Sequence, residues 1–521
     1  MRNYGYCEND CLVVYYYIKK ELEDYQRINK IPLTSTGHVR RELQELTRTN
    51  WKYRKKVYKA INTDAHVYNM LLDAFQGGYT HGNWLFTDEI VHDVDSYDFC
   101  SSYPFCLVSF RYPATEFKRC FVKTREEMSK NFAYLLKIRF KNIECKYYNT
   151  FISQSKCSYV EDAVVDNGRI MKAKEIEMTL TDIDFYFYLD SYNIEKYEIL
   201  ESYNSVYDYL PKLFIEFVLE KYVNKTKFKN VVGKEIEYQK EKNKFNSLYG
   251  MSVTNMIRDD VIYDNVTGWN EKELSNEDII GKLNQEKKKC FLSFAYGVWC
   301  TAYARNNLLR NVIKLDDYAV YMDTDSIKLR KGYDKKVIDD YNNFVRKKIQ
   351  YVSNKLKIPI EKFAPEDSKG VTRMLGLFDD DGHYDKFINQ GAKKYCYIKT
   401  KSNKKIDFEK ENVVEKGETE SKVLEITVAG VPKEGAKELK RIEDFKDDLV
   451  FHFENTNKQL LFYIEEQKPI NMVDYQGNEL IVNDISGCGL FPCTYVLGKA
   501  LEYSDLLTDN SSKRARYKEV I

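Results

Sequence analysis

Three short polar segments, far apart in the chain, supply the residue types that nucleotidyl transfer requires. They are residues 98–104 (DFCSSYP), 242–250 (KNKFNSLYG) and 321–326 (YMDTDS). The first and third bring carboxylates, and the second brings a lysine, an asparagine and a tyrosine. Carboxylates that share divalent metal ions, together with a cation facing a polyphosphate, are the groups that this reaction uses. The three segments together predict one active site.

The carboxylates must be positioned by strands. Asp323 and Asp325 lie at the polar centre of residues 318–329, which are otherwise rich in strand formers, and this pattern predicts a β-hairpin with the acidic pair at its tip. For Asp-Thr-Asp alone, an ordinary polar turn is the better interpretation. Residues 97–105 predict a second strand that carries Asp98 and ends in a proline-containing turn. Two adjacent strands of this kind would place Asp98 and Asp325 within reach of two Mg²⁺ ions, which prefer oxygen ligands.

The lysine of the second segment must be positioned by a helix. Residues 233–249 contain no proline and predict a helix that Gly250 ends. Four side chains, spaced at i, i+4, i+8 and i+11, share one face of this helix: Tyr238, Lys242, Asn246 and Tyr249. Such a face can contact the phosphates, sugar and base of one nucleotide. The alternative is a solvated face, which we assign to most other lysines between residues 221 and 244.

The three segments resemble motifs A, B and C of the family B DNA polymerases, whose patterns are D-x-x-S-L-Y-P, K-x-x-x-N-S-x-Y-G and Y-x-D-T-D-S. They occur in the family's order, with 323 − 98 = 225 residues between the first aspartates of motifs A and C. Residues 75–78 resemble Y-x-G-G, residues 301–305 resemble T-x-x-A-R, residues 393–395 resemble K-x-Y, and residues 428–433 resemble the entrance to the thumb. Seven ordered signatures cover nearly the whole chain.

The resemblance implies a template-directed DNA polymerase that uses two Mg²⁺ ions, with Mn²⁺ as an alternative. The metal ligands would be Asp98, Asp325 and the carbonyl of Phe99. Asp323 would be a supporting or transient ligand. Lys242 would neutralise the charge that develops on the phosphates.

The same resemblance assigns the contacts with nucleotide and DNA. Tyr103 would pack under the sugar and exclude a 2′-hydroxyl, while Tyr249 would line the nucleotide pocket with Asn246 and Ser101 beside it. The residues expected to contact primer-template DNA are Gly77, Gly78, Thr301, Arg305, Lys393 and Tyr395.

The fold that the resemblance implies is an α+β right-hand polymerase, with an antiparallel palm sheet, helical fingers, a small thumb and two insertion subdomains. Space for two insertions makes the likeness greatest to the protein-primed polymerases of small phages and linear plasmids. The expected divisions are an exonuclease remnant (1–31), a linker and first part of the palm (32–104), a first insertion (105–211), fingers with motif B (212–251), a second insertion (252–289), palm with motif C (290–425), and thumb with C-terminal segment (426–521).

Two positions depart from the family patterns. Ser102 stands where motif A has leucine, and Phe75 stands where Y-x-G-G has tyrosine. Neither change removes a metal ligand, so polymerase activity is still expected. The missing hydroxyl at Phe75 removes a polar contact that would coordinate synthesis with proofreading.

The first residues resemble the last motif of a 3′→5′ exonuclease. Tyr6 and Asp10 fit Y-x-x-x-D, although an aspartate on a helix surface explains so short a pattern equally well. The two earlier exonuclease motifs do not occur in this chain, and a two-metal exonuclease cannot be assembled from Asp10 alone. We therefore expect no proofreading from this chain, and a separately encoded exonuclease part is one hypothesis for a partner.

Composition limits the alternatives. The 521 residues suggest several subdomains, and a net charge of +1 means that DNA must be contacted by local patches. One such patch is residues 48–59, where cations alternate with aromatic residues as in single-strand binding sites; a solvated amphipathic helix is the alternative. The twelve cysteines form no C-x-x-C and the six histidines do not cluster near them, so structural zinc is not expected.

Other segments predict structure rather than chemistry. Residues 290–304 are apolar but too short to span a membrane, so they predict a buried helix. Residues 379–382 (DDDG) predict a hairpin turn and not a calcium loop. No signal-like apolar segment follows Met1, so we expect no membrane partner and a cytoplasmic location, within the host cell if the gene belongs to a phage.

The expected partners are primer-template DNA and dNTPs, with a terminal protein as a candidate primer. Two other functions remain open at this point. One is a nucleotidyltransferase that copies RNA or works without a template. The other is an inactive DNA-binding fragment that requires a separate exonuclease half.

Overall fold

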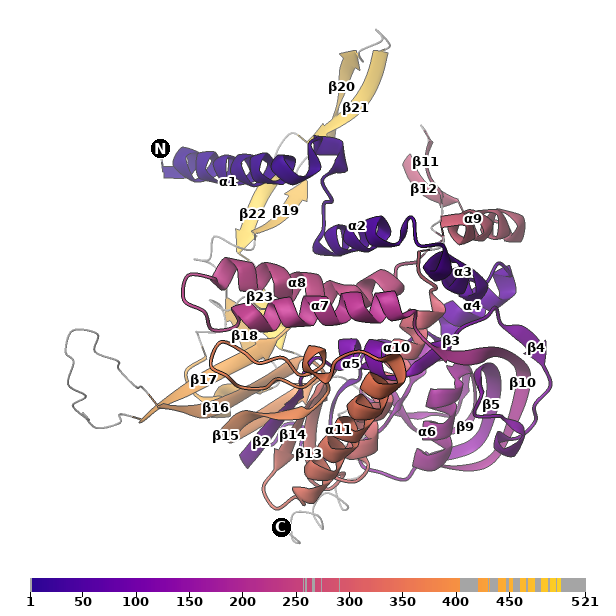
Figure 1. Cartoon of the computed structure of the whole chain (residues 1–521). Coiled ribbons are helices and arrows are strands. Elements are labelled where there is room, and N and C mark those ends of the chain that lie inside the picture. Colours follow the sequence, from indigo (N-terminus) through magenta and orange to yellow (C-terminus); the bar gives the residue numbers. More distant parts are fainter. Residues whose placement is uncertain are drawn as a thin grey trace.

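Two antiparallel sheets and their covering helices make up most of the molecule (Figure 1). The computed structural model describes residues 2–255, 257, 260–264, 268–272, 274–289, 291–402, 420–429, 431, 439–446, 449–452, 460–464, 467–473, 479–485, 488–492 and 494–497.

The first sheet brings together strands from three distant parts of the chain, as expected for a palm. Its order is β1-β13-β14-β2-β15-β16-β17. These strands are β1 (Thr80–Gly82), β13 (Ala319–Asp323), β14 (Ser326–Arg330), β2 (Val91–Phe99), β15 (Phe378–Gly391), β16 (Lys394–Ser402) and β17 (Glu420–Val428). The expected hairpin is present, because β13 pairs with β14 through the turn at Thr324 and Asp325. β14 in turn pairs with β2, the strand that carries Asp98.

Three helices pack around this sheet: α5 (Ser102–Ser109), α10 (Ala295–Val312) and α11 (Lys336–Leu356). The proline-containing turn predicted after β2 is wrong. Pro104 lies in the first turn of α5, where backbone N–H groups have no partner within the helix, so the missing N–H of proline costs little. The buried helix predicted at residues 290–304 is present, although α10 extends further, to Val312.

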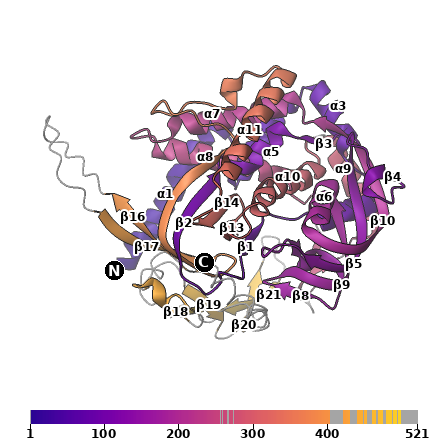
Figure 2. The ribbon, with the colours of Figure 1, turned by 90° about the horizontal axis from the view of Figure 1, so that it is seen from below.

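The second sheet is formed by residues 111–209, within the range expected for the first insertion. Its main order is β3-β10-β5-β9-β6, with β4, β7 and β8 paired at its edges. Helix α6 (Asp182–Ser191) packs on its long strands and joins it to α10 (Figure 2). The strands are β3 (Arg111–Pro113), β4 (Lys118–Cys120), β5 (Phe132–Cys145), β6 (Ile152–Ser153), β7 (Cys157–Glu161), β8 (Val164–Asp166), β9 (Arg169–Thr181) and β10 (Tyr192–Tyr209).

A pair of helices, α7 (Lys212–Phe228) and α8 (Glu235–Ser252), lies side by side above α5 (Figure 1). The helix predicted from residue 233 is confirmed, but its predicted end at Gly250 is wrong because α8 continues to Ser252. The remaining helices are α1 (Arg2–Tyr25), α2 (Ser35–Thr47), α3 (Trp51–Ala60), α4 (Ala65–Ala74) and α9 (Asn276–Lys289), with short 3₁₀ turns η1 (Ile28–Lys30), η2 (Arg125–Glu127), η3 (Gln154–Lys156), η4 (Ile360–Lys362) and η5 (Ile442–Asp444).

The hairpin turn predicted at residues 379–382 is wrong. These residues lie inside β15 and continue its pairing with β2, with a register shift between Asp380 and Gly382. Gly382 has a φ of +122°, which a glycine adopts without strain, so the acidic run forms a bulge in a strand.

Four further hairpin-like strand pairs complete the described backbone. β11 (Asp260–Asp264) pairs with β12 (Gly268–Lys272) in the range of the second expected insertion. The other pairs are β18 (Leu449–His452) with β23 (Thr494–Leu497), β19 (Leu460–Ile464) with β22 (Cys488–Pro492), and β20 (Gln467–Val473) with β21 (Glu479–Ile485). Of the expected thumb entrance, residues 430, 432 and 433 lie outside the described residues. Among the described helices, none has a stretch both long and apolar enough to cross a bilayer.

Candidate active site

Three neighbouring strands bring the predicted carboxylates together. β13 ends, β14 begins and β2 ends at the same side of the first sheet, which is called its edge below. Asp98 is the cross-strand partner of Ser326 at the start of β14. The backbone N–H of Phe99 donates to the carbonyl of Asp325 over 2.8 Å, which fixes the hairpin tip beside the end of β2. Asp98 and Asp325 are therefore brought together, although 227 residues (325 − 98) separate them in sequence.

Asp98 and Asp325 lie beside other carboxylates, and the ammonium of Lys328 is near both of them. Burial and the carboxylates of Asp325 and Asp381 raise the pKa of Asp98. Burial and Asp323 raise the pKa of Asp325. Neither carboxylate receives an ion pair or a hydrogen bond from another described residue. A cation placed between them would remove this repulsion, so the arrangement favours cation binding.

Asp323 has a different environment. Its carboxylate accepts hydrogen bonds from Thr80 and Thr324, both over 3.2 Å, and pairs with the ammonium of Lys393. Because its charge is already compensated, Asp323 is less available to a metal than the other two aspartates. The supporting role expected for Asp323 stays a prediction.

Two lysines near the carboxylates were not predicted. Lys328 is buried in β14, where its Nζ donates to Ser96 Oγ over 2.6 Å, and burial lowers its pKa beside Asp381, Asp98, Asp323 and Asp325. The available signal was its position two residues after Ser326, which places it on the same face of the strand. Lys225, on α7, donates to Ser101 Oγ over 3.3 Å, and burial lowers its pKa. Only the packing of α7 on α8 shows that Lys225 belongs to the site.

Two tyrosines connect motif A to motif B. The rings of Tyr103 and Tyr249 stack with their centroids 4.2 Å apart and an angle of 14° between their planes. Both side chains are half-buried, Lys242 lies two turns back along α8, and Asn246 is exposed between them. The structure therefore brings Tyr103 of motif A against Tyr249 of motif B, and Lys242 and Asn246 lie on the same helix as Tyr249.

The backbone around Phe99 and Ser101 is tightly held. The Phe99 ring stacks on Phe378 with centroids 3.9 Å apart, and its carbonyl accepts the N–H of Ser101 over 2.6 Å. Ser101 has a φ of +65° and precedes the first turn of α5. This bend directs the chain from β2 into the helix that carries Tyr103.

Gly78, in the segment that resembles Y-x-G-G, packs directly against the site. The N–H of Thr324, at the hairpin tip, donates to the carbonyl of Tyr79 over 2.7 Å. A Cβ atom at Gly78 would lie 2.7 Å from Cγ2 of Thr324 and 2.9 Å from the hydroxyl of Tyr103. Only glycine fits at position 78 without displacing these neighbours.

Thr301 and Arg305 of the T-x-x-A-R signature are buried, whereas side chains that contact DNA would be expected at the surface. Arg305 forms an ion pair with Asp184 of α6, with 2.8 Å between Nη2 and Oδ2, and donates to the carbonyls of Gln76 and Gly77. Thr301 donates to the backbone of its own helix. Arg305 thus supports the segment that resembles Y-x-G-G, and a direct contact of either side chain with DNA stays a prediction.

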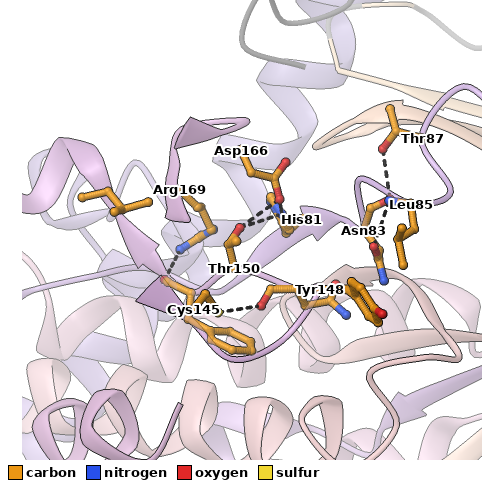
Figure 3. A network of polar contacts seen from close by, with 12 residues as sticks. His81, Asn83, Leu85, Thr87, Cys145, Tyr148, Thr150, Asp166 and Arg169 are labelled. Atoms are coloured by element: carbon orange, nitrogen blue, oxygen red, sulfur yellow. Dashed lines mark hydrogen bonds and ion pairs between the residues drawn. The ribbon is translucent and has the colours of Figure 1, made fainter. Parts of the chain in front are cut away.

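A second buried polar network joins β1 to the second sheet (Figure 3). Nε2 of His81 lies 2.8 Å from Oδ2 of Asp166 in β8, and Thr150 donates to the same carboxylate oxygen over 2.9 Å. All three side chains are fully buried. Since β1 also carries Thr80, this network supports the edge strand that contacts Asp323.

The remaining predicted residues fall at different places. Tyr395 packs its ring against Tyr321, with centroids 4.8 Å apart, and the backbone N–H of Lys393 donates to the Tyr321 hydroxyl. These contacts connect the K-x-Y signature to motif C. Tyr6 and Asp10 lie on α1, and the placement of their side chains is outside the described residues.

Comparison with known proteins gives the same family. The family described as DNA polymerase type B, organellar and viral, matches residues 2–344. No curated protein matches the chain. Among solved structures, phi29 DNA polymerase with primer-template DNA and incoming nucleotide has a TM-score of 0.59 at 18% identity, and covers 89% of this chain and 67% of that one. Its binary complex with primer-template DNA has a TM-score of 0.60 at 18% identity, covering 93% and 70%. The fold is therefore that of a right-hand polymerase.

The family match covers more than half of the sequence. The chain belongs to the organellar and viral type B DNA polymerases, the enzymes that carry out template-directed DNA synthesis.

Proposed function

We propose that this polymerase adds dNTPs to a primer 3′-hydroxyl with two divalent metal ions, Mg²⁺ or Mn²⁺, held by Asp98 and Asp325. The observation that supports this proposal is a pair of half-buried carboxylates at the ends of neighbouring strands, with their pKa raised by burial and by nearby carboxylates. Their oxygens are the donors that Mg²⁺ prefers, and substrate phosphates and waters would complete its shell, because no ready cluster of three metal-binding side chains occurs among the described residues. When bound, the ions lower the pKa of the 3′-hydroxyl and stabilise the leaving pyrophosphate.

The protein's own groups would bind and orient the nucleotide. Lys242 on α8 and Lys225 on α7 provide two ammonium groups toward the triphosphate, on the side of the carboxylates where Ser101 lies. The Tyr103–Tyr249 stack forms a flat apolar surface for the sugar and base. The Tyr103 ring is stacked on Tyr249, and it would exclude an additional 2′-hydroxyl from the sugar. Lys393 would hold Asp323 near the primer end.

The genome that the enzyme copies is proposed from the family likeness. The phi29 structures contain primer-template DNA, incoming nucleotide or single-stranded DNA, and we assign the first two as substrates of this chain. Replication of a phage or linear plasmid genome in the host cytoplasm, with a terminal protein as primer, is consistent with the two insertions. A separately encoded exonuclease part would supply proofreading.

Primer extension tests the reaction and its limits together. The purified chain should extend a matched DNA primer on a DNA template in Mg²⁺, fail to do so in EDTA, and prefer DNA over RNA templates. It should not shorten a mismatched single-stranded 3′ end, and Asp10→Ala should leave that result unchanged. Efficient copying of RNA would contradict the assigned reaction. Degradation that disappears with Asp10→Ala would show that the chain contains a complete exonuclease centre.

A further inference from the structure

A lysine is buried beside the carboxylates at the edge of the first sheet. Lys328 lies in β14 and is 5% exposed. β14 is paired on both sides, with β13 and with β2, so its side chains have no open strand edge beside them. Burying an ammonium is costly unless nearby groups compensate its charge. The groups around Lys328 therefore indicate what this lysine does.

The strand register places Lys328 directly behind the proposed metal ligands. Ser326 is the cross-strand partner of Asp98, and Lys328 is the cross-strand partner of Ser96. Residues two apart on a strand point to the same face and lie about 7 Å apart along it. Ser96 and Lys328 therefore form the row of side chains next to Asp98 and Ser326, on the same face of the first sheet.

The ammonium of Lys328 is held in place by uncharged groups. Its Nζ donates to Ser96 Oγ over 2.6 Å, and Ser96 Oγ donates to Asp381 Oδ2 over 3.2 Å. The same Nζ lies 5.7 Å from the centre of the Tyr384 ring, which stacks on Tyr397 with centroids 4.0 Å apart. A cation over an aromatic face is attracted by the ring. These contacts fix the position of the positive charge.

The charge of Lys328 is compensated at longer range. No carboxylate of the described residues forms an ion pair with it. Four carboxylates favour its ammonium form against burial: Asp381, Asp98, Asp323 and Asp325. Lys393, in contrast, is exposed and pairs directly with Asp323. Asp98 and Asp325 have no such direct partner among the described residues, and the buried ammonium acts on both of them.

A fixed positive charge at this place has two opposing effects. Without a metal ion, it lowers the repulsion between Asp98 and Asp325, so the site can assemble before a metal ion arrives. A divalent cation that binds at these carboxylates is repelled by the same ammonium, which reduces its affinity. Both effects depend on the charge and not on the shape of the side chain, so substitutions can separate them from packing.

We propose that Lys328 is a built-in counter-ion of the catalytic carboxylates, and that it weakens the binding of divalent metal ions at this edge. It is a positioning residue, because it acts through the carboxylates and sets the charge that a metal ion meets. The oxygens of the incoming triphosphate would then contribute a larger share of the metal affinity. The inference rests on the proposed function, because it requires metal ions at Asp98 and Asp325.

Direct binding of Mn²⁺ to the full chain, without DNA or nucleotide, tests the proposal. Electron paramagnetic resonance of the free ion would give the dissociation constant. The main variant is Lys328→Met, which keeps the length of the side chain and removes its charge. Lys328→Gln is a second neutral variant, which retains a hydrogen-bond donor toward Ser96. The matched control is Lys331→Met, the same change at an exposed position just after β14.

Two further variants separate the charge from the hydrogen bond. Lys328→Arg keeps the positive charge at the same position. Ser96→Ala removes the hydrogen bond to Lys328 and leaves the charge in place. Thermal unfolding in EDTA would show that each variant is folded before its metal binding is compared.

We expect Lys328→Met and Lys328→Gln to bind Mn²⁺ roughly three- to tenfold more tightly than the wild type, because a nearby positive charge is removed. The Mg²⁺ concentration that gives half-maximal primer extension should fall by a similar factor. The rise in unfolding midpoint on addition of Mn²⁺ should be larger than in the wild type. Lys331→Met and Lys328→Arg should match the wild type, and Ser96→Ala should shift the binding less than Lys328→Met does.

The sign of the change distinguishes this role from a structural one. Loss of packing alone would disorder the carboxylates and weaken metal binding. Unchanged or weaker Mn²⁺ binding in both neutral variants of Lys328 would therefore overturn the proposal. So would an equal gain in Ser96→Ala, since the hydrogen bond and not the charge would then be responsible.

Asp98→Asn tests the site on which the inference rests. If Asp98→Asn binds Mn²⁺ as tightly as the wild type does, the proposed function is contradicted. If Asp98→Asn loses Mn²⁺ binding while Lys328→Met binds like the wild type, the proposed function stands and the inference about Lys328 is wrong.

Discussion

Two groups of aspartates in this polymerase have opposite environments. At the edge of the first sheet, Asp98 and Asp325 face each other and receive no hydrogen bond from another described side chain. On α6, Asp184 pairs with Arg305, and Asp182 accepts hydrogen bonds from Tyr207 and Trp299. The first group is half-buried at an open edge, whereas the second is buried between α6 and α10.

The first group is suited to binding a cation. The second group, called the joint below, consists of Asp182 and Asp184 and holds α6 against α10. Carboxylates that repel each other raise the free energy of the folded chain until a cation binds between them. Carboxylates that accept donors from neighbouring elements hold those elements together, since a buried charge cannot lose its partner cheaply. Removing the carboxylate of Asp98 should therefore leave the stability unchanged or raise it, whereas removing the carboxylate of Asp184 should lower it, and the predictions below follow from that contrast.

The largest effect is expected at the catalytic edge. Asp98→Asn or Asp325→Asn removes one of the two proposed anionic metal ligands with almost no change in size, so the primer extension rate should fall roughly 10²- to 10⁴-fold. DNA affinity should be retained. Asp380→Asn is the matched control, because Asp380 is an exposed member of the acidic run in the neighbouring strand. A near-normal extension rate in either Asp98→Asn or Asp325→Asn would contradict the assignment of the metal site.

Breaking the joint should reduce stability instead. Arg305→Met leaves Asp184 buried without its cationic partner, and the free energy of unfolding should fall by about 3–5 kcal/mol in denaturant titrations. Arg310→Met, on the same helix, breaks a half-exposed pair with Asp190 and should cost under about 1 kcal/mol. An equal loss in the free energy of unfolding in the two variants would mean that the buried ion pair contributes no more stability than the half-exposed one.

The joint should also respond to pH. Burial raises the pKa of Asp182 to about 7, so the folded state takes up a proton that the unfolded state releases near pH 4. The stability contributed by this proton is present at low pH and is lost as pH rises through about 7. Asp182→Asn should therefore raise the free energy of unfolding at pH 8 by roughly 1–3 kcal/mol, and the gain should shrink below pH 5. A gain that is the same at pH 5 and pH 8 would exclude titration of Asp182 as the cause.

The smallest effect is expected in sugar selection. Tyr103→Val removes the ring that stacks on Tyr249, so the ratio of ribonucleotide to deoxynucleotide incorporation should rise roughly tenfold. Tyr103→Phe keeps the ring and should leave the ratio near the wild-type value. Single-nucleotide incorporation kinetics would measure both. An unchanged ratio in the valine variant would mean that another group excludes the 2′-hydroxyl.

The sequence predicted the parts of the site that depend on local patterns. Strand formers around Asp323 and Asp325 predicted the hairpin, and spacing along residues 233–249 predicted the face that carries Lys242. The pairing of distant segments was available only from the family resemblance, because no local signal connects Asp98 to a hairpin more than two hundred residues away.

The parts that the sequence did not predict depend on tertiary contacts. Pro104 suggests a turn, yet α5 tolerates it in its first turn. Residues 379–382 have turn composition, but pairing with β2 keeps them in a strand with a bulge. Arg305 and Lys328 are charged residues that would ordinarily be placed on the surface, and only their partners, Asp184 and the acidic edge, explain their burial.

One paired measurement tests the contrast between the site and the joint most directly. Asp98→Asn and Asp184→Asn are the same chemical change, and both variants would be assayed for extension rate in Mg²⁺ and for thermal unfolding in EDTA, without divalent ions. We predict that Asp98→Asn loses at least roughly 10²-fold in extension with an unfolding midpoint at or above that of the wild type. Asp184→Asn should lower the midpoint by several degrees. Retained extension or a lowered midpoint in Asp98→Asn would contradict the assignment of this edge as the cation-binding catalytic site.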